Sequence, residues 1–195
     1  MLNEQGHIIL LRRNRLDRLV PSSLHLQPHR SMTTHHRLAG VPMQFRWRRF
    51  EEFGCDELYT VLALRQNVLV VEQSSPYPDL DFVDQAADHL LVSDNETLIG
   101  YARCHPPLPG SACASFGRVV VAQQYRGKEL GKELVSRVIA RLAEGRCPDI
   151  LIGAQLYLEE FYADFGFTRD GEPYDDVGVA HINMRLRLRS SGAEK

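Results

Sequence analysis

The sequence predicts an α/β (α+β) fold whose elements follow in the order β-α-β-β-β-α-β-α-β. Three observations support this prediction. Short apolar or alternating runs are typical of strands, longer stretches between them carry apolar residues at helical spacing, and Gly and Pro residues separate the two kinds. Because helices alternate with strands in the C-terminal half, we expect some parallel pairing and hence a mixed sheet flanked by helices.

The first predicted strand begins at Met43. Beyond it, Phe45 and Trp47 alternate with Arg46 and Arg48, which is typical of a strand with one apolar face. Asp56 is a suitable N-cap for the helix that follows, and the apolar residues of this helix continue to Val71. Pro76 and Pro78 then break the helix, because proline cannot continue its hydrogen-bond ladder. We therefore expect a loop that extends to Asp88.

Three strands should follow this loop as a meander, and the rest of the chain alternates between helix and strand. The longer of the two later helices carries one apolar stripe at helical spacing. The predicted ranges are 89–93, 98–104 and 116–122 for the meander, 130–142 and 155–165 for the helices, and 149–153 and 179–188 for the last two strands.

Composition places the chain among ordinary globular proteins. Its 195 residues are 44% hydrophobic and 25% charged, and no apolar run is long enough to cross a bilayer. The net charge of -2 is uneven, because residues 1–42 hold six Arg against Glu4 and Asp17, which leaves -6 for the remainder. This acidic remainder argues against nucleic acid as a partner and favours a cationic, amine-bearing substrate.

Residues 1–42 lack sustained periodicity, and we interpret them as a flexible N-terminal extension. A transit peptide and an upstream start codon both remain open for this segment. Its five His residues are scattered among Arg, Ser and Pro, which indicates a polar segment rather than a metal site. We expect one domain at 43–190 and a short tail at 191–195.

The four cysteines indicate reduced thiols in a cytoplasmic protein. They form no C-x-x-C pair, have no zinc-ligand spacing and follow no secretory signal peptide. We therefore expect neither a disulfide framework nor a metal. The positions are Cys55, Cys104, Cys113 and Cys147.

The junction between strand 118–121 and the helix near Lys128 is the most informative part of the sequence. Free backbone N–H groups and the positive end of the helix dipole bind phosphate oxygens at such a helix start. Gly127 permits close backbone approach, Arg126 and Lys128 add positive charge, and Gln124 could fix the turn through its amide. The alternative is that the glycines only allow a tight connection. No nucleoside triphosphate or dinucleotide fingerprint is present.

Two runs of the sequence, residues 118–131 and residues 161–167, follow each other along the chain. They resemble the two motifs of the GNAT superfamily of N-acetyltransferases, in the same order, and the resemblance covers residues 43–189. It implies a central sheet of six to seven strands and acetyl-CoA as co-substrate, with no metal. The GNAT motifs are Arg118-Val119-Val120-Val121, Gln124-x-x-Gly127, Leu130-Gly131 and the run 161–167. Further matches at 64–66, 70–73, 76–77, 153–155 and 181–184 are similar to ElaA-like proteins.

The resemblance implies a set of cofactor-binding residues. Glu129 departs from the glycine or alanine usual in the superfamily, so its carboxylate must point away from the phosphates. The implied set consists of Val119, Val120, Val121, Gln124, Arg126, Gly127, Lys128, Glu129, Leu130, Gly131, Lys132, Gln155 and Tyr162.

For catalysis, the resemblance implies direct attack of a primary amine on the thioester, with Tyr162 as the acid for the departing thiolate. Tyr157 offers a competing hydroxyl. Glu72 and His181 are the preferred candidates for the base, and the acidic run 79–88 could select a cationic amine. Other candidates for the base are Asp81, Asp84, Asp88 and His89.

A second class of function stays open, namely a catalytically silent CoA-binding or interaction module. A cysteine hydrolase that uses Cys104 and His105 is disfavoured, because adjacent strand residues point to opposite faces. The acceptor, a small-molecule or peptide amine, is not identified by the sequence, and a homodimer remains open. We expect no nucleic-acid partner and no membrane partner.

Overall fold

The computed structural model describes residues 43–107, 111–145 and 147–188. The predicted extension 1–42 and the tail 191–195 lie outside these ranges. The elements are β1 (Gln44–Arg49), η1 (Phe50–Glu52), α1 (Cys55–Arg65), η2 (Gln66–Val71), η3 (Asp84–Ala86), β2 (Asp88–Asp94), β3 (Thr97–His105), β4 (Ser115–Val121), η4 (Gln123–Tyr125), α2 (Leu130–Ala143), β5 (Asp149–Gln155), η5 (Leu156–Leu158), α3 (Glu159–Ala163), β6 (Thr168–Arg169), β7 (Tyr174–Asp176) and β8 (Val179–Arg187).

The strands form two antiparallel sheets, so the fold is α+β and the predicted order of elements is confirmed. The first sheet has the order β1-β2-β3-β4, and the second has β8 between β5 and β6, with β7 also paired to β8. Parallel contact between the sheets is one isolated bridge, Ala114 to Ile150. The short strands β6 and β7 lie in a region that the sequence did not predict as strand.

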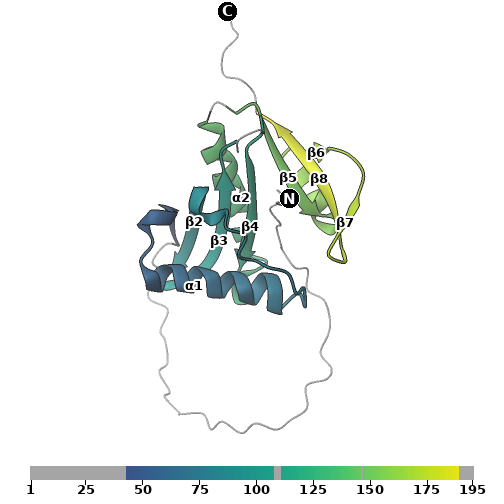
Figure 1. The fold of residues 1–195 in the computed structure, drawn as a ribbon. Helices are drawn as coiled ribbons and strands as arrows, with labels where there is room; N and C mark the ends of the chain where they lie inside the picture. The colour runs from purple at the N-terminus through teal and green to yellow at the C-terminus, as the bar shows by residue number, and fades with distance from the viewer. Residues whose placement is uncertain (1–42, 108–110, 146, 189–195) are drawn as a thin grey trace, which may run out of the picture.

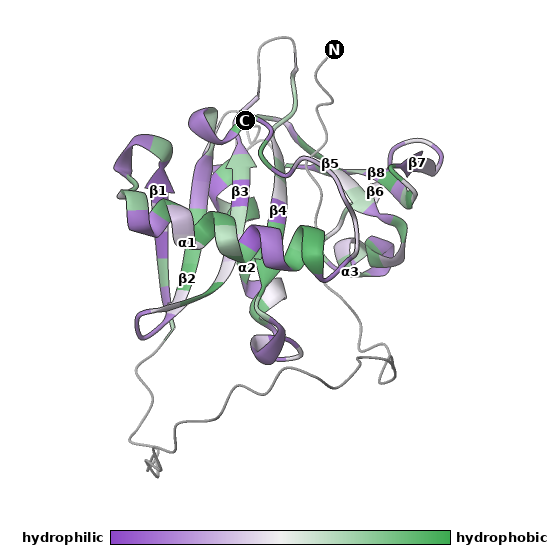
Figure 2. Ribbon diagram, turned by 60° about the horizontal axis from the view of Figure 1, so that its bottom comes forward, coloured by the Kyte–Doolittle hydropathy of each residue, from purple (hydrophilic) through white to green (hydrophobic). Residues whose placement is uncertain are grey.

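Helices α1 and α2 cover opposite faces of the first sheet (Figure 1). Leu134, Val135 and Val138 of α2 are fully buried against one face, as the predicted apolar stripe requires. On the other face, Val61 of α1 packs with Tyr101 of β3. The edge strand β1 is largely hydrophilic, whereas β2 carries a hydrophobic run (Figure 2).

The first helix differs from its prediction at both ends. Gly54 is the N-cap, and Asp56 lies inside the first turn, so the predicted cap is wrong by two residues. Beyond Arg65 the chain continues helically through η2 in π geometry, where the N–H of Glu72 donates to Asn67 O at 2.9 Å. π-Turns of this kind are frequent at functional sites.

Strands β4 and β5 meet at one end and separate beyond it (Figure 1). The N–H of Ala114 donates to Asp149 O at 3.0 Å, and the N–H of Leu151 donates to Ala114 O at 2.9 Å. No other pairing joins β4 and β5 within the described residues. The edge of β4 that faces β5 therefore has no sheet partner along Val119–Val121.

The segment after β5 is less helical than predicted. The expected helix over 155–165 is a 3-10 turn, η5, followed by the short α3. Helix α3 ends at Ala163, and the turn after it closes at Gly166, whose φ of 88° is in the left-handed region that favours glycine.

Candidate active site

The turn between β4 and α2 has the backbone geometry of a helix start open to a ligand. Gly127 has φ 72° and Glu129, the N-cap of α2, has φ 60°, both in the left-handed region. No side chain caps the first N–H groups of α2. A Cβ on Gly127 would meet no atom within 4 Å, so the glycine serves the backbone conformation and the space around it is open.

The carboxylate of Glu129 points away from the predicted phosphate site, as its negative charge requires. Its side chain is 79% exposed and pairs with Lys132 at 3.6 Å, so the carboxylate is turned towards solvent and a cation. Its left-handed backbone also gives a physical reason for glycine at this position in other members of the superfamily. Gln124 is exposed and makes no side-chain hydrogen bond within the described residues, so its predicted role in the turn is wrong.

Arg126 is not a free cation of the turn. Its Nε donates to Val121 O at 2.9 Å, and its Nη2 donates to Glu72 Oε2 at 2.7 Å. Lys128 lies with Nζ 5.5 Å from the centre of the Tyr125 ring. The turn therefore presents Lys128 and Lys132 to solvent, while Arg126 joins it to the end of η2.

A cavity of about 360 Å³ lies beside the start of α2 and gives a ligand room there. Four of the predicted cofactor residues line it, together with two residues of the N-terminal strand region and two of the next helical turn. The lining is Met43, Phe45, Lys128, Glu129, Leu130, Lys132, Glu133 and Ser136.

Three of the predicted cofactor residues are buried in β4. Val119, Val120 and Val121 have no more than 1% of their surface exposed, and only their backbone edge is without a sheet partner. Leu130 and Gly131 are buried at the start of α2. Gln155, the last residue of β5, is 5% exposed and lies opposite His181 in the register of β5 with β8.

Tyr162 of α3 is fully buried, with none of its surface exposed to solvent. It packs edge-to-face against Phe161 and Phe167, and its hydroxyl has no hydrogen-bond partner among the described residues. Burial, with a smaller contribution from Tyr157, raises the pKa of Tyr162 well above its usual value. The hydroxyl therefore keeps its proton at neutral pH.

Tyr157 is the more accessible hydroxyl, because 51% of the residue is exposed. It lines a cavity of about 620 Å³ with Leu156, Glu160 and Asp164. Tyr162 is not among the residues that line this cavity.

The two preferred bases occupy different environments. Glu72 is at the C-cap of η2 with its carboxylate paired to Arg126, 28% exposed. His181 is 2% exposed, has Nδ1 2.8 Å from Val179 O and stacks on Tyr174 with ring centres 5.9 Å apart. Glu72 thus lies beside the cofactor turn, and His181 lies within the second sheet.

Sequence reasoning missed a buried cluster of three arginines and three aspartates. Its members are Arg65, Arg103, Arg118, Asp79, Asp81 and Asp84, and we call it the Arg–Asp cluster. Arg118 Nε lies 2.7 Å from Asp79 Oδ1, and both Nη atoms of Arg103 contact Asp81 at 2.6 and 2.7 Å. Arg65 donates to Asp79 and Asp84 at 2.9 Å. Arginines inside the apolar strand runs were the available signal.

The Arg–Asp cluster removes Asp81 and Asp84 as candidate bases. Burial alone would raise the pKa of Asp81, but hydrogen bonds and charge from Arg103, with the charge of Arg118, lower it well below the usual value. The pKa of Asp84 is lowered in the same way by Arg65 and Arg103. Because these carboxylates are matched by arginines, the prediction that the acidic run offers free negative charge to an amine is wrong for them.

His89, Asp88 and Cys104 have structural partners or environments that argue against catalysis. His89 is buried between Tyr101 Oη at 2.7 Å and Asp84 O at 2.9 Å, and burial lowers its pKa. Asp88 accepts from Arg141 Nε at 3.1 Å. Burial raises the pKa of Cys104 to about 12, which keeps the thiol protonated and removes it as a nucleophile.

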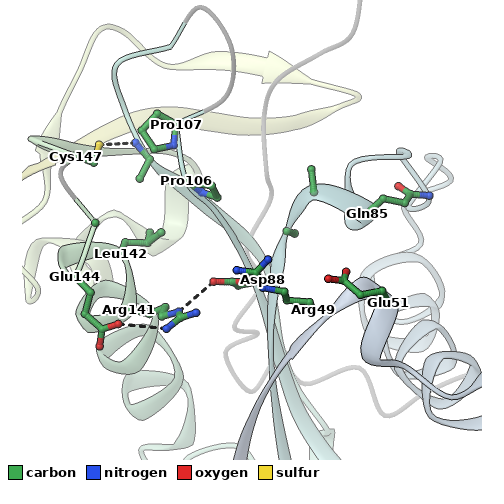
Figure 3. A pocket seen from close by; sticks show the side chains of 14 residues that line it. Arg49, Glu51, Gln85, Asp88, Pro106, Pro107, Arg141, Leu142, Glu144 and Cys147 are labelled. Atoms are coloured by element: carbon green, nitrogen blue, oxygen red, sulfur yellow. Dashed lines mark hydrogen bonds and ion pairs between the residues drawn. The ribbon is translucent and has the colours of Figure 1, made fainter.

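A larger cavity, about 710 Å³, lies at the C-terminal end of α2, away from the turn at its N-terminus (Figure 3). Arg141 is held there by Asp88 and by Glu144, and Cys147 Sγ accepts from the N–H of Ala114 at 3.0 Å. Size alone would favour this cavity as the active site. None of the predicted cofactor residues lines it, so we place the chemistry at the turn.

Comparison with known proteins identifies relatives with the same fold. Residues 68–188 match the family described as Acetyltransferase (GNAT) domain. The UPF0039 protein sll0451 of Synechocystis sp. is 40% identical over 78% of this chain and 100% of its own length. Protein ElaA of Escherichia coli is 36% identical over 68% of this chain and 89% of its own.

Two solved structures superpose on the fold of this chain. An acyl-CoA N-acyltransferase from Pseudomonas aeruginosa superposes with a TM-score of 0.70 at 29% identity, covering 74% of this chain and 99% of its own. Escherichia coli ElaA superposes with a TM-score of 0.69 at 32% identity, with the same coverage of each chain.

The fold, with an unpaired β4 edge that leads into a helix start, defines the class of acyl-CoA-dependent acyltransferases. No helix among the described residues has the length and apolarity needed to span a bilayer. The chain belongs to the GNAT acetyltransferase family, and its resemblance to ElaA-like proteins is confirmed.

Proposed function

We propose that this protein transfers an acetyl group from acetyl-CoA directly to a primary amine. The observation that carries the proposal is the continuous path from the unpaired edge of β4 to the open N-terminus of α2. An extended thioester arm can pair with that edge as a strand would, while a diphosphate binds the N–H groups beyond Gly127.

In the proposed reaction, a backbone N–H of the Val119–Val121 edge polarises the thioester carbonyl, where negative charge develops. The amine nitrogen attacks the carbonyl carbon, the C–S bond breaks, and the thiolate takes a proton from a tyrosine hydroxyl. Before the attack, the acceptor ammonium loses one proton to Glu72 or His181, directly or through water. The second proton, which the nitrogen loses as the amide forms, returns to the tyrosine oxygen and restores the acid. No covalent intermediate on the protein is needed.

Tyr162 is our first choice for the acid, because its buried hydroxyl is protonated and has no hydrogen-bond partner in the part of the chain that the structure describes. Tyr157 is the alternative, since its hydroxyl belongs to a more exposed residue of the same segment. The two assignments differ in which tyrosine is needed for turnover.

The proposal is tested by isothermal titration with acetyl-CoA on the wild type, Gly127→Asp and Gly127→Asn. Both substitutions place a Cβ at φ 72°, but only aspartate adds negative charge where the phosphates would bind. We expect Gly127→Asp to abolish binding and Gly127→Asn to weaken it far less. Equal affinities in all three proteins would refute the placement of the diphosphate.

A catalytically silent CoA-binding module is the second candidate. The complete burial of Tyr162 favours it, since a sealed hydroxyl cannot reach a thiolate unless its surroundings move. Thermal stabilisation by acetyl-CoA, without release of free CoA across a broad panel of amines, would support this candidate over the enzyme.

A further inference from the structure

Two of the four free cysteines lie together at the end where β4 and β5 meet. Cys113 belongs to the segment that leads into β4, and Cys147 belongs to the connection between α2 and β5. Cys147 Sγ accepts from the N–H of Ala114 at 3.0 Å (Figure 3) and lies 3.2 Å from Ala112 O. These two atoms belong to the peptide groups on either side of Cys113, so the thiol of Cys147 lies beside the backbone of Cys113.

The spacing of the two cysteines is compatible with a disulfide. Cα atoms joined by a disulfide are usually about 4.4–6.8 Å apart, and a thiol that contacts both peptide groups around a residue is close to the Cα of that residue. The side chain of Cys113 points elsewhere, because its Sγ accepts from Arg185 Nη1 at 3.1 Å. A rotation about the Cα–Cβ bond of Cys113, which is partly exposed, is therefore the movement that the bond requires.

Cys113 has the surroundings of a reactive thiol. It is partly exposed, and Arg185 donates to its sulfur. The same guanidinium donates to Asp149 at 2.9 Å and to Asp170 at 2.6 Å, and these carboxylates hold it in place and share its charge. A donor fixed beside the sulfur stabilises the negative charge that a thiolate carries when it attacks.

Cys147 is suited to a second step rather than to a first. Only 8% of the residue is exposed, so a reagent in solution has little access to its sulfur. It borders the cavity of about 710 Å³ at the C-terminal end of α2, which gives a leaving group a route out (Figure 3). A thiol in this position reacts with a disulfide that has already formed on its neighbour.

The other two cysteines lack this arrangement. Cys55 is exposed at the start of α1, far along the chain from the pair. Cys104 is buried in β3, where burial raises the pKa of its thiol to about 12. Among the described residues, the hydrogen bond from Arg185 to Cys113 is the only one that an arginine donates to a sulfur.

We propose that Cys113 and Cys147 form a reversible disulfide when the protein meets a low-molecular-weight disulfide such as oxidised glutathione. The Cys113 thiolate attacks one sulfur of the reagent, the S–S bond breaks, and the first thiol leaves with the proton that Cys113 gave up. Cys147 then loses its proton and attacks the Cys113 sulfur, and the second thiol leaves with that proton. Two protein thiols are oxidised, and one disulfide is reduced to two thiols.

The disulfide would join two segments that already meet. The N–H of Ala114 donates to Asp149 O at 3.0 Å, so the approach to β4 and the start of β5 are held together by their backbones. The disulfide would therefore act chiefly on the unfolded chain, whose freedom it reduces by closing the loop from Cys113 to Cys147. The oxidised protein should be more stable than the reduced protein, whether or not the protein transfers acetyl groups.

The test incubates the native full-length chain with oxidised glutathione, alkylates the remaining thiols and identifies disulfides in unreduced tryptic peptides by tandem mass spectrometry. Fragment ions are needed, because Cys104 and Cys113 share the peptide 104–118. We expect a link between Cys113 and Cys147 in the wild type and in Cys55→Ser, the control that removes an exposed thiol. The linked protein should have a Tm about 8 °C higher, and dithiothreitol should reverse the shift.

Two variants test the order of the steps. Cys147→Ser should stop at a mixed disulfide between Cys113 and glutathione, whereas Cys113→Ser should leave Cys147 reduced. Glutathione bound to Cys147 in Cys113→Ser would overturn the assigned order. A wild type that forms no link, that joins Cys147 to Cys104, or that forms the link only in urea would overturn the pair, because the folded structure would then not direct the bond.

Discussion

Arg126 Nη2 lies 2.7 Å from Glu72 Oε2, and this pair links the turn that precedes α2 to the end of the first helical segment. The same guanidinium holds Val121 O through Nε. One side chain thus connects the proposed diphosphate site, the β4 edge and the candidate base. A diphosphate bound at the turn would compete with Glu72 for Arg126.

We predict that Glu72→Gln tightens acetyl-CoA binding about threefold, because it frees the charge of Arg126 for the phosphates without removing its hydrogen bond to Val121. Isothermal titration measures the effect. Glu144→Gln is the control, since Glu144 pairs with Arg141 at the C-terminal end of α2, away from the turn. Weaker binding by Glu72→Gln would mean that the pair orders the turn rather than competing with the ligand.

We predict that Tyr162→Phe lowers turnover about a hundredfold and leaves acetyl-CoA affinity nearly unchanged, as loss of a general acid requires. Thermal stability should hold or rise, because the hydroxyl removed is buried and has no partner among the described residues. Tyr157→Phe, assayed in parallel, distinguishes the two hydroxyls. Full turnover in Tyr162→Phe with loss in Tyr157→Phe would transfer the acid role to Tyr157.

The two motifs and the order of elements could be predicted because they depend on local features. Alternation, helical spacing and glycine positions are set within a few residues of the chain, and the turn at Gly127 is one such feature. The contacts of Arg126 and Arg118 could not be predicted, because their partners lie 54 and 39 positions away. Such pairings depend on tertiary packing, and the periodicity of the sequence carries no information about it.

The acidic run at 79–88 is a second case in which partners distant in the sequence could not be predicted. Its composition predicted a solvated loop with free negative charge, whereas Asp79 and Asp84 are buried by arginines from α1, β3 and β4. A single sequence does not reveal which charges neutralise each other. Arg103 and Arg118 within strands were nevertheless a signal, because a charge in a buried strand requires a partner.

We predict that Phe82→Gly stabilises the protein by about 1 kcal/mol, or about 3 °C in Tm, because glycine adopts the left-handed conformation at φ 59° without strain. Thermal unfolding measures the change. Asn95→Gly is the control, because Asn95 has φ 53° but asparagine tolerates this region. A Tm below that of the wild type would show that packing of the Phe82 ring outweighs the strain of its backbone.

We predict that the free energy of unfolding falls as the pH is lowered from about 6.5 to about 4, in part because of His105. This side chain is 6% exposed, and burial together with the charge of Arg103 lowers its pKa to about 4, although Asp81 and Asp84 act in the opposite direction. The unfolded chain takes up a proton near pH 6.5, whereas the folded chain resists it until about pH 4. The contribution of His105 to the free energy of unfolding is therefore fully present above pH 6.5. It is lost between pH 6.5 and about pH 4, and the loss amounts to at most about 3 kcal/mol.

Urea unfolding of the wild type and His105→Gln at several pH values measures this contribution. The variant should show a shallower dependence between pH 6.5 and 4, with the remainder coming from His89, whose pKa is also lowered by burial. Below pH 4 both proteins should lose stability together, because Asp81 and Asp84 have lowered pKa values in the folded state and their contribution disappears as they protonate. Identical slopes for the two proteins above pH 4 would show that His105 accepts a proton in the folded protein as readily as in the unfolded chain.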